Sequence, residues 1–553
     1  MCTTMIITKG ATADGSMVVT HSDDDELADQ RVIRVPAADH PEGSLRPIMP
    51  ESYPYPRMVT SGRGPGYDTA DWAATEPIGA IPEVAHTYAY FDGNYGIVNE
   101  HNLMMGECTN GAKYEPHYVT AEEAAETDQH RRLFYSSELS RVALERCRTA
   151  REAIALMGEL IDTYGYYSTG ETLLVSDEDE GWVFEMCALP SETRHSAWIA
   201  QRVPDGEAFV AANEFRIREV PSQDYEQIHS QTLVEDLQAV GWWDPKDGRL
   251  DWLRAVSPGE YNHPYYSLRR VWRVFDRMNP DLGLSPWVQD GYTTAYPFSI
   301  APNHKLGLEE IFSLYRDHYE GTQFDLTIGT AAGPYGDPNR FAGRYDGNQN
   351  DVTNGLTTYG AWERPISVFY QGYSFVLQTR PNVPEPARCL MWFAPDISYT
   401  SVFAPFYVKC TEFPWSYQSG DPRQLDRTSA WWAFDFVANW ARLNFQRMTR
   451  ADILPLQAKK EREARAAIAA VDDDVRDDPE RALQAITDFG IANAGSLLEA
   501  WWSLADRLVA KYSDGYISPP VKVRASPTPI GYPATWLAAT DYSNGPVSYA
   551  MKG

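Results

Sequence analysis

The stretch from Cys2 to Asp24 constrains the fold of this chain more than any other part of the sequence. The apolar residues that follow Cys2 predict a buried strand, and Asp14-Gly15 predicts a tight turn into a second strand from Met17 to Thr20. A strand start would hold Cys2 rigidly, which a frayed terminus could not do. The sequence therefore predicts an N-terminal hairpin that begins with a cysteine.

If Met1 is removed, Cys2 becomes the first residue and carries a free α-amine as well as its thiol. An unperturbed α-amine titrates at ~8 and a thiol at ~8.5, so proton exchange between them at neutral pH is nearly thermoneutral. Such a residue is a nucleophile and a base in one. A single cysteine signals little without partners, so its position alone does not establish catalysis.

The composition is that of a globular chain and excludes several classes of partner. The 553 residues are 43% hydrophobic and 13% aromatic, with a formal net charge of −29. Nucleic acids and anionic membranes are bound by concentrated Lys and Arg, so we expect neither as a partner. The acidity favours solubility, and attraction of a substrate ammonium group is the alternative interpretation.

Cysteine usage and hydropathy favour a cytoplasmic location. The six cysteines are widely spaced, with no Cys-x-x-Cys, which fits a reducing compartment better than a disulfide scaffold. No run of eighteen apolar residues occurs, and the N-terminus lacks a basic-plus-apolar signal sequence. The eleven histidines form neither His-Glu-x-x-His nor a close pair, so we expect no metal and no cofactor.

Residues 1–212 alternate between predicted strands and a pair of helices. After the hairpin, strands are expected at 31–35, 86–90, 96–98, 172–176, 182–186, 197–203 and 208–212, and residues 43–83 show little periodicity. The first helix is predicted over 137–148. A capping box of Thr149 and Glu152 opens the second, which Tyr164-Gly165 ends. Two strands, a helical pair and an antiparallel meander favour an α+β layered domain.

Helices become more frequent in the rest of the chain. We expect helices over 266–279, 308–318, 429–448, 456–471 and 479–512, paired strands at 367–379 and 389–394, and an irregular tail from residue 513. We find no internal repeat and no low-complexity linker. One catalytic domain over 2–425, with a mainly helical extension over 426–553 packed on it, is therefore favoured over two independent domains.

Three short motifs of the N-terminal stretch resemble the cysteine dipeptidase family of N-terminal-nucleophile hydrolases. They are Cys-Thr-Thr at 2–4, Asp-Gly-Ser at 14–16 and the acidic pair Asp23-Asp24. This family includes dipeptidase A and the secernins, and is more distantly similar to penicillin V acylases and bile salt hydrolases. The likeness extends to about Phe406. It implies a four-layer αββα sandwich, whereas the residue patterns alone reach only the α+β layered class.

The resemblance implies that Asp24 binds the α-amine of Cys2. From the residues alone, Asp24 fits a solvated acidic loop better. A hairpin would bring it beside Cys2, where burial and cationic neighbours must offset the rise that a carboxylate causes in the pKa of an amine. The relatives usually carry Arg three residues before this acid, and this chain has His21. A neutral histidine supports a thiolate less than arginine does.

Asn213 and Arg270 match two further active-site positions of the relatives. An amide group aimed at a developing oxyanion contributes about 3 kcal/mol. An ordinary turn asparagine and a solvated helix arginine are the alternatives, and Arg269 is a second candidate for the arginine. The other oxyanion donor of the acylases falls at Cys108-Thr109, where we expect a backbone N–H, so Thr109 is a substrate-binding candidate.

Glu107 and Glu185 also match family positions, and either carboxylate suits the ammonium group of a dipeptide. Glu185 lies in the otherwise apolar run 182–186, on the same strand face as Val183. A buried carboxylate there must be paired or functional. A structural ion pair is the alternative for both residues.

The resemblance therefore predicts a dipeptidase in which Cys2 attacks the peptide carbonyl, its α-amine transfers the proton, and a thioester forms before hydrolysis. The substrate would be a small peptide, and the sequence leaves open whether the chain is a monomer or a homo-oligomer. Two alternatives remain: an acylase of N-acyl amides on the same scaffold, and a non-catalytic secernin-like interaction protein. We expect only Cys2 to combine a lowered thiol pKa with access to substrate, and the other thiols to be buried.

Overall fold

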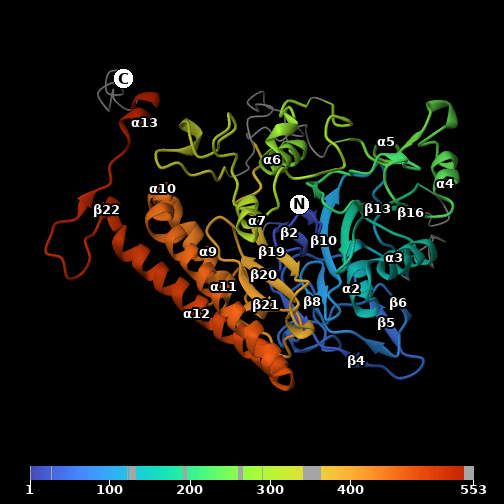
Figure 1. The fold of residues 1–553 in the computed structure, drawn as a ribbon, viewed down its shortest axis with the longest axis horizontal. Coiled ribbons are helices and arrows are strands. Elements are labelled where there is room, and N and C mark those ends of the chain that lie inside the picture. The colour runs from blue at the N-terminus through green and yellow to red at the C-terminus, as the bar shows by residue number, and fades with distance from the viewer. Residues whose placement is uncertain are drawn as a thin grey trace.

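Two antiparallel sheets lie at the centre of the molecule, with helices packed against both (Figure 1). The computed structural model describes residues 2–25, 28–120, 122–123, 132–190, 196–259, 266–288, 290–340 and 363–540. The mixture of helices and antiparallel strands agrees with the expected α+β class.

The first sheet is built around the N-terminal hairpin. Within the described residues its seven strands have the order β18 (Ser299–Ile300), β14 (Ala208–Ala211), β1 (Thr3–Ile7), β2 (Met17–Asp24), β19 (Gln371–Thr379), β20 (Cys389–Pro395) and β21 (Ala404–Tyr407). Thr3 lies opposite Ser22, as the predicted hairpin requires. β2 continues beyond Thr20 because β19 pairs with it as far as Asp24. The acidic pair is therefore part of a buried strand and not a solvated loop.

The second sheet contains the strand that carries Glu107. In the described part of the chain its eight strands have the order β16 (Gln227–His229), β13 (Ser196–Val203), β12 (Gly181–Ala188), β11 (Gly170–Ser176), β10 (Met104–Asn110), β9 (Gly96–Asn99), β8 (Tyr90–Asp92) and β3 (Ile33–Val35). Side chains of β12 alternate as predicted. Val183 packs in the core between the sheets, whereas Trp182 and Phe184 pack on the side of the two predicted helices.

The two sheets face each other across an apolar core. Ile6 and Val19 of the first sheet pack there with Leu174 of the second. Gly106 of β10 permits a close approach, because a Cβ at this position would lie 2.6 Å from the Thr4 hydroxyl oxygen. A larger residue would push the sheets apart one position before Glu107.

Helices pack against the outer side of each sheet. α2 (Ser136–Arg146) and α3 (Ala150–Tyr164) lie against the second sheet, and the predicted capping box of Thr149 and Glu152 opens α3. α9 (Ala430–Ala441), α11 (Leu454–Asp477) and α12 (Ala482–Lys511) lie beside β20 and β21 of the first sheet (Figure 1). The other described helices are α4 (Leu233–Ala239), α5 (Trp252–Val256), α6 (Leu268–Met278), α7 (Leu308–Tyr315), α8 (Trp415–Gln418), α10 (Phe445–Met448) and α13 (Ala534–Ala539).

Short strands occupy two regions that the sequence predicted to be irregular. β5 (Leu45–Ile48) pairs with β6 (Gly79–Pro82), and the tail contains β22 (Tyr516–Ile517), β23 (Thr528–Pro529) and α13. Those predictions were wrong because strands of two to four residues carry too little periodicity to be recognised. The remaining short pairs are β4 (Ala38–Asp39) with β7 (His86–Thr87) and β15 (Glu219–Val220) with β17 (Leu250–Asp251).

Several predicted helix and strand boundaries differ from those in the structure. The helix expected over 429–448 is divided at Ala441 by a 3₁₀ turn, and the strand expected from 367 begins at Gln371. Among the described residues, every helix is too short or too polar to cross a bilayer. The domain boundary at residue 425 stays a prediction.

Candidate active site

Cys2 lies directly before β1 and is buried between the two sheets. Continuing the β1–β2 register by one residue places it opposite Asp23, so both side chains are on the face that meets the second sheet. The Cys2 thiol donates a hydrogen bond to Glu107 Oε2 on β10, with a Sγ–Oε2 distance of 2.9 Å. The sheet packing therefore joins the candidate nucleophile to one of the predicted acids.

The electrostatic environment of the Cys2 thiol differs from the expectation. Burial and the Glu107 carboxylate raise the pKa of this thiol well above its ordinary value. The lowered pKa and open access that we expected are therefore wrong for the chain that retains Met1. The other five thiols are buried and free, as predicted.

Arg270 on α6 links the Cys2 backbone to Asn213. One of its guanidinium nitrogens donates to the Cys2 carbonyl oxygen at 2.8 Å, and the other donates to Asn213 Oδ1 at 2.7 Å. Arg269 instead lies over the ring of Phe324 and approaches Glu363 at 3.5 Å. Of the two candidate arginines, Arg270 is thus the one in the network.

Asn213 follows β14 in a backbone conformation that asparagine tolerates better than most residues, with φ of +67°. Its side-chain amide donates to the Thr109 carbonyl oxygen at 2.8 Å. The Thr109 hydroxyl donates in turn to Glu107 Oε1, also at 2.8 Å. These bonds fix the orientation of the Asn213 amide, which is the group predicted to face an oxyanion.

Asp24 pairs with Arg364, a residue that the sequence analysis missed. The Nη2 and Oδ2 atoms lie 2.5 Å apart and both side chains are fully buried. Arg364 also donates to Asn213 Oδ1 at 2.7 Å. Arg364 lies in a stretch without recognisable periodicity, so no local signal identified it.

His21 occupies the position where the relatives usually carry arginine, and it contacts the same strand as Glu107. Its Nδ1 lies 3.0 Å from the Glu107 carbonyl oxygen. Burial lowers its pKa, so the ring is held neutral and contributes no charge. The positive charge of the site comes instead from Arg270 and Arg364.

A second acid, Glu171 on β11, lies next to Glu107. The two carboxyl groups share a hydrogen bond, and the hydroxyl of Tyr135 donates to Glu171. Burial, and after it the charge of Glu107, raises the pKa of Glu171 well above its ordinary range. The raised pKa favours the protonated form of Glu171 beside the Glu107 carboxylate. The sequence did not indicate this pairing, because no residue near Glu171 in the chain shows that it lies beside Glu107.

Glu185 lies away from this network. Its carboxylate accepts hydrogen bonds from the backbone N–H of Arg216 at 2.6 Å and from Trp252 Nε1 at 2.7 Å. Burial raises its pKa to about 7. These contacts anchor the segment after Asn213. The hydrogen bonds of the described residues thus connect every predicted site residue except Glu185, whose substrate-binding role stays a prediction.

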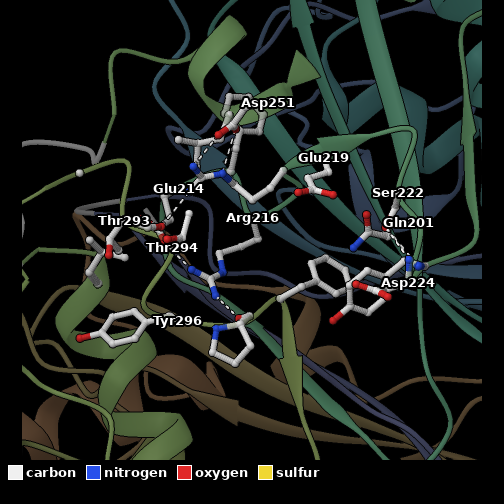
Figure 2. A pocket seen from close by; sticks show the side chains of 18 residues that line it. Gln201, Glu214, Arg216, Glu219, Ser222, Asp224, Asp251, Thr293, Thr294 and Tyr296 are labelled. Atoms are coloured by element: carbon white, nitrogen blue, oxygen red, sulfur yellow. Dashed lines mark hydrogen bonds and ion pairs between the residues drawn. The ribbon is translucent and has the colours of Figure 1, made fainter. Parts of the chain in front are cut away.

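A separate cavity of about 270 Å³ lies beyond Asn213 (Figure 2). Four of its charged side chains form two ion pairs, Arg216 with Glu214 at 2.9 Å and Arg218 with Asp251 at 2.5 Å. Its described lining residues do not include Cys2 or any group hydrogen-bonded to the Cys2 thiol. The cavity therefore lacks the candidate nucleophile Cys2, and we assign the chemistry to the network around Cys2.

Three side chains of that network are of types that bind metal ions. One ligand atom from each of Cys2, His21 and Asp23 lies within 4.8 Å of the others. The histidine spacing in the sequence did not indicate this group, because it arises from two strands paired in register.

The Cys2 thiol, which hydrogen-bonds to a buried carboxylate, is thus the candidate nucleophile of this site. The chain belongs to Peptidase family C69, whose family model matches residues 1–454. This confirms the resemblance to the cysteine dipeptidases.

Several curated proteins are similar over most of the chain. A probable dipeptidase of Salmonella dublin is 27% identical over 76% of this chain and 83% of its own length. A probable dipeptidase of Latilactobacillus sakei is 23% identical, covering 85% and 87%. Dipeptidase A of Lactobacillus helveticus is 24% identical, covering 77% and 79%.

Proposed function

We propose that this chain is a dipeptidase that uses Cys2 as its nucleophile after Met1 has been removed. Membership of Peptidase family C69 and the dipeptidase names of the relatives support the activity. The single observation that carries the assignment is the position of the Cys2 thiol, 2.9 Å from Glu107 in a network that also holds Asn213 and Arg270.

The proposed reaction has two stages. The Cys2 thiol passes its proton to the α-amine as sulfur bonds to the peptide carbonyl carbon, and the amine returns that proton to the leaving amino group as the C–N bond breaks. Water then attacks the thioester, releasing the acid and restoring the thiol. The oriented Asn213 amide would stabilise the oxyanion, worth about 3 kcal/mol.

Asp24 and Arg364 would act on the α-amine rather than on the substrate. Asp24 lies one residue beyond the position opposite Cys2, and its charge is balanced by Arg364 at 2.5 Å. A balanced carboxylate can orient an amine without raising its pKa as far as an isolated one would. The helix-covered pair of facing sheets supports the further proposal of an N-terminal-nucleophile hydrolase fold of αββα type.

The pair of Glu107 and Glu171 favours a substrate with a free ammonium group. A cation beside two carboxyl groups would replace their shared proton and relieve the raised pKa of Glu171. An acylase needs an apolar acyl pocket, whereas the hydroxyl groups of Tyr53, Tyr95 and Tyr135 contact one another next to Glu171. This polar lining favours the dipeptidase over the acylase.

The test combines an intact mass with one substitution. We expect active protein to lack Met1 and the Cys2→Ala variant to lose several orders of magnitude in dipeptide hydrolysis. The control Cys147→Ala removes a buried thiol at the end of α2 and should keep wild-type activity. If Cys2→Ala keeps more than about a tenth of the rate, a barrier change below ~1.4 kcal/mol, Cys2 is not the nucleophile. Full activity with Met1 retained would exclude the α-amine as base.

A further inference from the structure

The side chains of Cys2, His21 and Asp23 converge on one face of the N-terminal hairpin. Thr4 lies opposite His21 in the register, and two further steps place Cys2 opposite Asp23, so all three side chains are on the face of the hairpin that meets the second sheet. One ligand atom of each lies within 4.8 Å of the other two, and all three side chains are buried.

The contacts of His21 resemble those of a metal-binding histidine. Its Nδ1 lies 3.0 Å from the Glu107 carbonyl oxygen and 3.4 Å from the Glu107 backbone nitrogen, and the shorter contact favours the tautomer with the proton on Nδ1 and the lone pair on Nε2. Nε2 is buried and has no hydrogen-bond partner among the described residues. An Nδ1–H bonded to a carbonyl is the usual support of a ligating imidazole. A buried imidazole lone pair without a donor lacks a compensating contact.

Asp23 is also held by neighbours. Asn94 donates to Asp23 Oδ2, and the hydroxyl group of Tyr373 also hydrogen-bonds to this carboxyl group. Hydrogen bonds of this kind orient ligating carboxylates. The group therefore combines three ligand types with support from residues outside it.

We propose that this group is a binding site for Zn²⁺, and that zinc bound there inhibits the enzyme reversibly. Thiolate, imidazole and carboxylate are the ligands that zinc takes, whereas Mg²⁺ and Ca²⁺ prefer oxygen alone. In tetrahedral zinc sites neighbouring ligand atoms lie roughly 3.5 Å apart, so the widest separation here must close by about 1 Å.

The α-amine of the processed chain supplies a fourth ligand. Amine and thiolate of one cysteine close a five-membered chelate ring around the metal. As the Zn–S bond forms, the thiol proton is released to solvent, and the sulfur lone pair is no longer available for attack. Inhibition rests on the proposed function, because it requires Cys2 to be the nucleophile, whereas zinc binding itself does not.

The experiment measures binding apart from activity. Calorimetric titration of the metal-free, processed protein with ZnCl₂ should give one site, and MgCl₂ should give no heat. His21→Ala and Asp23→Asn should each weaken zinc binding 10-fold or more. The matched control His86→Gln, which alters an exposed histidine paired with Asp39 at 2.7 Å, should bind as wild type does. A chain with an N-terminal extension lacks the α-amine and should bind more weakly.

If either variant fails to fold, Co²⁺ can be bound to the wild-type protein in place of Zn²⁺ and followed by its absorption spectrum. A thiolate-to-cobalt absorption band in the near ultraviolet is expected, and its absence would overturn the site. Zinc binding that is unchanged in both folded variants would overturn it as well. Absence of zinc inhibition in a Cys2-dependent enzyme refutes the inhibition alone, whereas an active Cys2→Ala variant refutes the proposed function and leaves the binding result standing.

Discussion

The Cys2 thiol and the Glu107 carboxylate form a hydrogen bond of 2.9 Å between the two sheets, although 105 residues separate them in the chain. Glu107 also accepts from the Thr109 hydroxyl and shares a proton with Glu171. One carboxylate thus connects the candidate nucleophile, a strand neighbour and a second acid. Its removal should affect substrate binding more than folding of the hairpin.

Glu107→Gln should lower kcat/KM for dipeptides by about 30-fold, because it removes a charged partner of the substrate ammonium worth about 2 kcal/mol. Steady-state hydrolysis of one dipeptide by both proteins measures this. Glu178→Gln, at a partly exposed acid paired with Arg388, is the control and should be unaffected. A wild-type kcat/KM in Glu107→Gln would contradict the ammonium-binding role.

Acetylation of the substrate amine tests Glu171 together with Glu107. The wild-type enzyme should hydrolyse a free dipeptide at least 30-fold faster than its N-acetyl derivative, the scale of about 2 kcal/mol for a lost charged hydrogen bond. In Glu171→Gln the rate on the free dipeptide should exceed the rate on its N-acetyl derivative by a smaller factor, because the second carboxyl group that would bind the ammonium is absent. Equal rates on both substrates in the wild-type enzyme would favour the acylase.

Arg364→Gln should lower the free energy of unfolding by about 3 kcal/mol, because the buried Asp24 carboxylate loses its guanidinium partner. Urea denaturation measures the change. Adding Asp24→Asn should recover part of the loss, since the charge that needed a partner is then absent. Arg423→Gln, in an exposed pair with Asp421, should change the free energy of unfolding much less. Equal costs for the two arginines would argue against a buried ion pair.

Glu185 should make stability depend on pH. Burial raises its pKa from 4.5 to about 7, so the folded chain holds a proton that the unfolded chain releases in this range. The free energy of unfolding contributed by Glu185 is therefore fully present below pH 4.5 and falls as the pH rises to about 7, by about 3 kcal/mol. The glutamine in Glu185→Gln does not titrate. In urea denaturation, the free energy of unfolding of the wild type minus that of the variant should therefore decrease as the pH rises across this range. A constant difference would refute the raised pKa.

Thr149→Ala should lower the free energy of unfolding by about 1 kcal/mol. The Thr149 side chain accepts from the Glu152 backbone N–H, and this bond of the capping box would be lost at the start of α3. Thr428→Ala, at an exposed threonine whose hydroxyl donates to Asp426, serves as the comparison and should change stability less. Equal effects of the two substitutions would contradict the capping role.

Local patterns in the sequence determined the elements whose causes are local. The turn at Asp14-Gly15 predicted the hairpin, Thr149 with Glu152 predicted the start of α3, and strand alternation predicted which face of β12 carries Glu185. Each of these depends on residues within a few positions of one another. Resemblance, and not periodicity, then indicated which polar residues matter.

The tertiary structure alone decided how the site is charged and connected. Arg364 reaches Asp24 across 340 residues, Glu171 shares a proton with Glu107, and the opposition of two strands brings His21 and Asp23 to Cys2. Ion pairing and proton sharing depend on distance and burial after the sheets have packed, and neither quantity is encoded in spacing along the chain. For the same reason the sequence could indicate Cys2 as a candidate nucleophile, but it could not predict that burial and Glu107 raise the pKa of its thiol.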